Sequence, residues 1–163
     1  MSRLLLPALL LTATAASGAP ATHPAEMRLT QPEIAAQHRA SGGPGTSGVA
    51  GIQTIVLAGD PTAAGPYTIE LRVPANTKIA AHTHRDDRTA VVVSGIWHFG
   101  YGPVANASAT KALGPGSFYS EPGGDAHFAM TGATPVTVII SGFGPTDTKF
   151  VAAAPATHTE KRP

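Results

Sequence analysis

The sequence of 163 residues contains no cysteine, which excludes disulfides, thiolate catalysis and cysteine-ligated zinc. Charged residues are sparse, at 13%, and the 11 Lys and Arg residues are balanced by 10 Asp and Glu residues. Without a basic surplus the protein has little to neutralise a phosphate backbone, so nucleic acid is not an expected partner. Glycine and proline are abundant instead, with 18 and 15 copies. Such a composition is expected of many short strands joined by turns.

A long apolar run is also missing near the N-terminus, where residues 4–11 are apolar but too short to span a bilayer. This run follows Arg3 and precedes small neutral residues, which is the layout of a secretory signal peptide. We therefore expect residues 1–19 to be a signal peptide, cleaved after a residue between 15 and 19. The mature protein should be periplasmic or secreted and should not be held in the membrane.

The remaining chain has the length of one domain. Residues 20–29 are expected to form a flexible lead-in, residues 30–152 a single domain and residues 153–163 a flexible tail. Thr30 and Glu33 have the spacing of a capping box with a proline between them, which predicts a short helix over residues 31–39.

From residue 51 onward the pattern is typical of β-strands. Short segments, either apolar or alternating between apolar and polar residues, are separated by turns rich in glycine and proline. We expect strands at residues 51–58, 67–73, 79–84, 89–93, 96–99, 118–119, 126–130, 134–141 and 148–151. This series predicts an all-β barrel or sandwich.

Three histidines are candidates for a metal site. His82 and His84 are two residues apart, so on an extended chain their imidazoles point to the same face and can converge on one ion. The alternative is a solvated, histidine-rich loop. His127 follows a glycine-rich turn and begins a predicted strand. His98 lies between two aromatic residues on another predicted strand, and a structural role is expected for it.

These residues resemble the two sequence motifs of the cupins. The histidine pair fits the first motif, and six residues separate position 88 from Gly95, as that motif requires. The second motif is matched at every spacing by Gly116, Pro122, Gly124 and His127, with Thr131 in its final position. Residues 27–30 and 139–145 also resemble a group of small, single-domain bacterial cupins of unassigned function. The resemblance implies a jelly-roll barrel, also called a double-stranded β-helix, with a short N-terminal helix.

The resemblance further implies a divalent transition metal, Fe, Zn, Ni or Cu, with three imidazole ligands: His82, His84 and His127. The family's usual glutamate ligand is missing, because its position holds Arg88, and arginine cannot bind a metal. Asp86 or Asp87 could supply a carboxylate in its place. A surface turn, or a salt bridge to a neighbouring arginine, is the favoured interpretation of both aspartates.

Arg88 has two interpretations. It either pairs with an aspartate at the mouth of the barrel or faces the cavity, where its guanidinium would hold an anionic substrate through two hydrogen bonds. Tyr119 and Thr131 are the other substrate-binding candidates, and no catalytic residue is identified.

The expected function is to bind or transform a small anionic organic molecule at the three-histidine site. Some three-histidine cupins are iron-dependent dioxygenases, and isomerase or lyase chemistry is equally compatible with the resemblance. The alternatives are a non-catalytic cupin that binds a small ligand without metal, and a barrel with an interaction role. A homodimer is one possible assembly.

Overall fold

The computed structural model describes residues 26–43 and 45–151. The expected signal peptide at residues 1–19, most of the lead-in and the tail at residues 153–163 lie outside the described residues. Within the described residues, no helix combines the length and the apolar character needed to cross a membrane.

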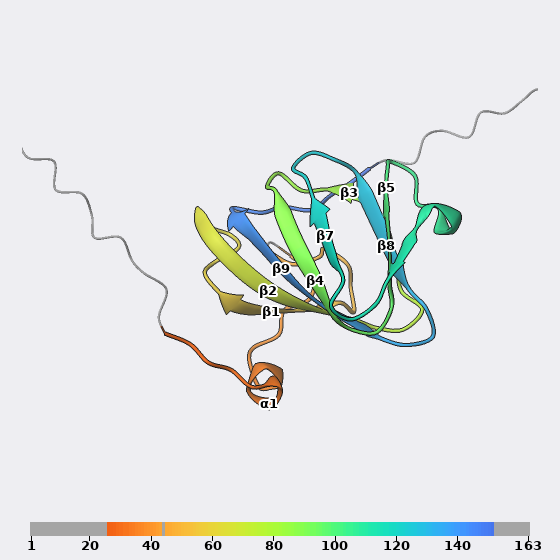
Figure 1. Ribbon diagram of the computed structural model, residues 1–163. Coiled ribbons are helices and arrows are strands. Elements are labelled where there is room, and N and C mark those ends of the chain that lie inside the picture. The colour runs from red at the N-terminus through yellow and green to blue at the C-terminus, as the bar shows by residue number, and fades with distance from the viewer. Residues whose placement is uncertain (1–25, 44, 152–163) are drawn as a thin grey trace, which may run out of the picture.

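Two five-stranded antiparallel sheets form the domain (Figure 1). The first sheet has the order β1 (Gln53–Ala58), β2 (Gly65–Val73), β9 (Val136–Gly144), β4 (Arg88–Ser94) and β7 (Phe118–Glu121). The second has the order β10 (Lys149–Phe150), β3 (Lys78–Thr83), β8 (His127–Thr131), β5 (Trp97–Tyr101) and β6 (Lys111–Leu113). A short α-helix, α1 (Gln31–Ala35), precedes them, and one 3-10 turn (Ala107–Ala109) precedes β6. The predicted all-β architecture is confirmed.

Alternation along the strands places apolar side chains between the two sheets. On β2, Ile69, Leu71 and Val73 are buried in the core, while Thr68 and Arg72 are only partly buried on the other face. Aromatic and aliphatic residues of both sheets complete one continuous core, among them Trp97, Phe99, Val138 and Ile140. A core of this kind supports the end of the barrel where the histidines lie.

The helix is shorter than predicted, ending at Ala35 instead of residue 39. Its start is as expected, since the Glu33 carboxylate accepts hydrogen bonds from the amide and the hydroxyl of Thr30, both at 2.7 Å. The end is set by tertiary structure. Arg39 donates to the Ala35 carbonyl at 2.6 Å, and the following residue, Ala40, bridges to a strand residue and draws the chain out of the helix.

Strand β6 was not predicted. It contains only the three residues Lys111–Leu113, too few to display an alternating pattern. Pairing with β5 makes this segment a strand, so its structure depends on a distant neighbour rather than on local sequence.

Candidate metal centre

The three histidines meet at one end of the barrel. His82 is in β3, His84 follows that strand, and His127 begins β8, paired directly with His82 in the register of the two strands. One nitrogen from each ring lies within 4.8 Å of the other two. Their residue exposures are 6%, 2% and 1%, so the alternative of a solvated loop is wrong. The convergence predicted from the spacing is confirmed.

Each imidazole is oriented by a backbone carbonyl. The Nδ1 atom of each ring lies within hydrogen-bond distance of a carbonyl oxygen. In the neutral tautomer that carries its proton on Nδ1, each ring donates a hydrogen bond to that oxygen. The carbonyl of Ala80 accepts from His82 at 2.7 Å, that of Asp147 accepts from His84, and that of Asp125 accepts from His127 at 3.2 Å. Each Nε2 atom then carries a lone pair, as in metal-binding histidines, and the lone pair of His84 accepts a hydrogen bond from Arg88. His127 Nε2 is buried and has no hydrogen-bond partner among the described residues.

Burial keeps these rings neutral. Desolvation lowers the pKa of His82 to about 4 and that of His84 to about 3, and it also lowers the pKa of His127. The neutral imidazole is the form that binds a metal. The tautomers, the burial and the unpartnered Nε2 atom together fit a transition-metal ion.

The glycine-rich turn before His127 is tied to the histidine pair. The Gly124 amide donates to the His84 carbonyl at 2.8 Å, and the Gly123 amide donates to the Asp87 carboxylate at 2.7 Å. Gly124 has a φ of +84°, a conformation that glycine adopts at little cost. These bonds hold the two motifs in one fixed arrangement.

Arg88 faces the cavity and is only 6% exposed, so the interpretation of a rim residue paired with an aspartate is wrong. Its guanidinium is already engaged. Arg88 Nε donates to Glu121 Oε2 at 2.6 Å, and Nη2 contacts the same oxygen. Nη2 also donates to His84 Nε2 at 2.5 Å. The arginine therefore does not offer a free positive charge to a substrate.

Glu121 is a residue of the site that the sequence did not reveal. Its Oε2 atom lies 3.8 Å from His84 Nε2, and its Oε1 atom lies 3.7 Å from His127 Nε2. Burial by itself would raise the pKa of Glu121, but the Arg88 guanidinium and the histidines outweigh burial and hold it below its ordinary value. In the sequence Glu121 stands at a predicted turn. Only the pairing of Arg88 with Glu121 across β4 and β7 brings it to the histidines.

The two aspartates are not brought to the histidines. Asp86 is buried, and its Oδ2 accepts a hydrogen bond from the Tyr67 hydroxyl at 2.7 Å. Asp87 is exposed and bonds the turn at Gly123, so the turn role favoured for the aspartates holds for this one. Asp86 instead takes part in a buried hydrogen bond within the barrel. Neither supplies the missing carboxylate.

The other two substrate-binding candidates differ in position. Tyr119 lines the cavity, and its buried hydroxyl has no hydrogen-bond partner in the part of the chain that the structure describes. Burial raises the Tyr119 pKa well above its usual value. Thr131 ends β8, four residues from His127. Its hydroxyl donates to Pro74 O at 2.7 Å and accepts from Thr77 N at 2.9 Å. Thr131 thus fastens the turn between β2 and β3 and lies outside the cavity.

The cavity beside the histidines has a volume of about 20 Å³. Such a space holds about one water molecule or ion. Its walls include Trp97, Phe99 and Tyr119, and Ser47 closes it from the segment before β1. Phe150 of β10 lies against the His82 ring, with centroids 5.8 Å apart. An organic molecule could enter only if this cover moved.

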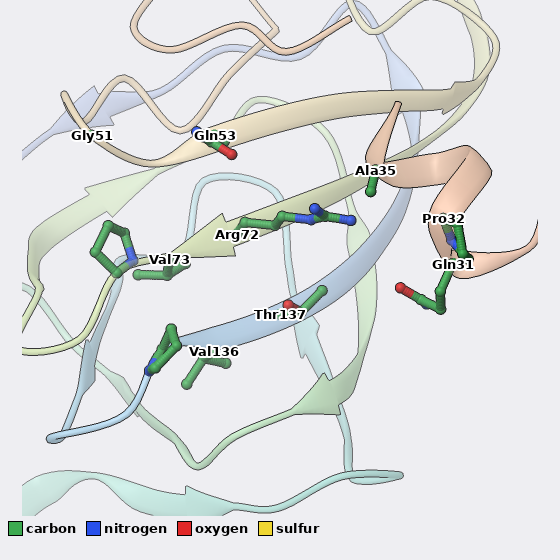
Figure 2. Close-up of a pocket in the computed structure, with 11 residues that line it drawn as sticks. Gln31, Pro32, Ala35, Gly51, Gln53, Arg72, Val73, Val136 and Thr137 are labelled. Carbon is green, nitrogen blue, oxygen red and sulfur yellow. The ribbon is translucent and has the colours of Figure 1, made fainter. Parts of the chain in front are cut away.

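A larger hollow, of about 630 Å³, lies between α1 and the first sheet (Figure 2). Arg72 extends across it, with Gln31 and Gln53 on its walls. The Arg72 guanidinium pairs with Glu70 at 2.7 Å, and none of the three histidines lines this hollow. The histidine cluster, Arg88 and Glu121 line the smaller cavity instead.

A β-barrel with three inward-facing histidines at one end could hold a metal ion, and the comparisons identify its fold. The chain aligns with the polyketide cyclase RemF from Streptomyces resistomycificus at 18% identity and a TM-score of 0.60, covering 80% of this chain and 88% of that one. An RmlC-like cupin from Shewanella frigidimarina aligns at 16% identity and a TM-score of 0.53, with 74% and 92% covered. The chain has the cupin fold, a double-stranded β-helix.

Another neighbour is the DMSP lyase DddQ from Ruegeria pomeroyi, at 16% identity and a TM-score of 0.52, with 63% of this chain and 54% of that one covered. The chain spans about half of the length of the DMSP lyase chains that it matches. No protein-family model matches the sequence, and no curated protein is significantly similar to it. At these identities the likeness extends to the fold alone.

Proposed function

We propose that the domain binds one divalent transition-metal ion through the Nε2 atoms of three histidines: His82, His84 and His127. The observation that carries this proposal is the set of three buried, neutral imidazoles, each with its Nδ1 atom within hydrogen-bond distance of a backbone carbonyl and with one ring nitrogen within 4.8 Å of the other two. Zn, Fe, Ni and Cu all accept such ligands. When bound, the ion would supply Lewis acidity and, if it were iron or copper, redox chemistry.

The substrate that we propose is a small organic molecule bound beside the ion. Neighbours with the same fold include a polyketide cyclase and a DMSP lyase, which is consistent with small-molecule chemistry in such a barrel. The anionic character expected from Arg88 loses that basis, because its guanidinium is paired with Glu121. A preference for an anion now rests on the positive charge of the ion, since the charges of Arg88 and Glu121 cancel. Dioxygenase, isomerase and lyase reactions all remain compatible with the donor set.

Entry of a substrate requires the cover over the cavity to open. Ser47 and Phe150 belong to that cover. Ser47 lies before β1, and Phe150 lies in β10, a two-residue strand at the edge of the second sheet. In the closed form the residues around the ion exclude bulk water. Tyr119 would then stand beside the reacting molecule with a hydroxyl free to donate a hydrogen bond.

A second candidate function is a metal-free cupin that binds a small ligand without catalysis. The observation that favours it is the contact of Arg88 Nη2 with His84 Nε2, which places a cation where an ion would be bound. The two candidates differ in the metal content of the purified protein. Export through a signal peptide and a homodimeric assembly stay predictions under either candidate.

The proposal is tested by metal titration of the full chain and of three alanine variants: His82→Ala, His84→Ala and His127→Ala. We expect about one equivalent of divalent metal in the parent and a large loss of metal affinity in each variant, because each lacks one of the three converging imidazoles. His98→Ala is the matched control, since His98 is half-buried on β5 and outside the cluster. Unchanged binding in all three variants would contradict the proposal.

A further inference from the structure

Resting on the proposed function, we infer that Glu121 is the fourth, anionic ligand of the metal, and that Arg88 holds this carboxylate in place until the ion arrives. A metal site would then have three imidazoles and one carboxylate, with the carboxylate supplied by β7. Three observations support this assignment.

The first observation is distance. Glu121 Oε2 lies 3.8 Å from His84 Nε2, and Glu121 Oε1 lies 3.7 Å from His127 Nε2. Two ligand atoms on one tetrahedral ion, each about 2.1 Å from it, are separated by about 3.4 Å. Each carboxylate oxygen is therefore within a few tenths of an ångström of ligand separation from one histidine. Asp86, by contrast, is turned to Tyr67 and makes no contact with the cluster.

The second observation is the strand register. Arg88 of β4 is paired directly with Glu121 of β7, so both side chains point into the same end of the barrel. An arginine at position 88 would leave the site without a carboxylate if its partner were apolar. Because the partner is a glutamate, the negative charge is present one strand away.

The third observation is the position of the Arg88 guanidinium. Its Nη2 atom lies 2.5 Å from His84 Nε2 and in contact with Glu121 Oε2, bridging two of the proposed ligand atoms. A cationic group thus already occupies the space between them. A metal ion that bound both atoms would displace Nη2 and keep the paired carboxylate. Arg88 is accordingly a positioning residue that competes with the ion.

The test compares two variants that both lack the arginine, Arg88→Met and the double variant Arg88→Met with Glu121→Gln. Removing both charged groups avoids a lone buried charge, so the double variant is expected to fold. Zn²⁺ affinity is measured by chelator competition, and the visible spectrum of bound Co²⁺ reports the donor set. We expect Arg88→Met to bind Zn²⁺ about 10–100-fold more tightly than the parent, because the ion no longer has to break the charged hydrogen bonds of the guanidinium to Glu121 and His84.

The double variant should bind Zn²⁺ at least about 100-fold more weakly than Arg88→Met, beyond the usual effect of a residue that touches only a ligand. Its Co²⁺ spectrum should also change. Glu70→Gln is the matched control, because Glu70 is another fully buried, arginine-paired glutamate, located on β2 away from the cavity. That control should leave Zn²⁺ affinity unchanged.

Two results would overturn the inference in distinguishable ways. If the parent and Arg88→Met both bind Zn²⁺ and the double variant matches Arg88→Met in affinity and Co²⁺ spectrum, Glu121 is not a ligand, and the three-histidine site stands. If neither the parent nor Arg88→Met binds Zn²⁺ or Co²⁺, the proposed metal site fails, and the inference fails with it.

Discussion

Replacing Arg88 with methionine should destabilise the metal-free protein, and bound metal should offset part of that loss. Arg88 and Glu121 are 6% and 4% exposed, and they are joined by hydrogen bonds within the barrel. Removing one partner of a buried ion pair leaves an uncompensated charge and typically costs about 3–5 kcal/mol. We therefore expect the free energy of unfolding of metal-free Arg88→Met to fall by about this amount. The melting temperature should drop by about 6–20 °C, at roughly 2–4 °C per kcal/mol.

Bound metal should reduce the difference in unfolding free energy between Arg88→Met and the parent. In the variant, the ion would take over the role of the guanidinium by neutralising the Glu121 carboxylate, and no arginine nitrogen would compete for His84. If the variant binds the ion about 10–100-fold more tightly, the metal adds about 1.4–2.7 kcal/mol more stability to the variant than to the parent.

Urea unfolding of both proteins, with a chelator and with saturating Zn²⁺, measures these quantities. Arg85→Met is the matched control, because Arg85 pairs with Asp147 at 3.1 Å on the surface, with a side chain that is 53% exposed. An exposed pair of this kind contributes at most about 1 kcal/mol. Equal stability of Arg88→Met and the parent in chelator would refute the reasoning about the buried pair. A stability difference that Zn²⁺ leaves unchanged would refute the coupling between the pair and the metal.

Three further predictions follow from other parts of the chain. Gly95→Ala should lower the free energy of unfolding in urea by about 1–3 kcal/mol or more, because φ is +78° there and an added Cβ would lie 2.4 Å from the Pro135 carbonyl oxygen. Gly132→Ala is the control and should change it little, because an added Cβ there meets open space. Tyr67→Phe should lower the free energy of unfolding by about 1–3 kcal/mol, because it leaves the buried Asp86 carboxylate unpaired. The Zn²⁺ affinity of this variant should stay unchanged, and a loss of affinity would contradict our placement of Asp86 outside the metal site. Mass spectrometry of exported protein should find an N-terminus between residues 16 and 20, and an intact Met1 would exclude the signal peptide.

The sequence alone determined the features that depend on local spacing. A period of two along a strand put His82 and His84 on one face, and a glycine-rich turn at the cupin spacing marked His127 as their partner. Short apolar segments between glycine- and proline-rich turns were enough to predict an all-β barrel or sandwich. These signals are carried by neighbouring residues, and the structure confirmed each of them.

Only the tertiary structure decided what surrounds the histidines. Glu121 is 33 residues from Arg88 in the chain, and the two meet because β4 and β7 pair in one particular register. Register is fixed by packing across the whole sheet, and a shift of one residue would turn both side chains to the opposite face. The closed cavity likewise depends on Ser47 and Phe150, which reach the histidines from distant segments. The sequence could therefore predict which residues come together as candidate metal ligands, whereas the charge and size of their site required the folded chain.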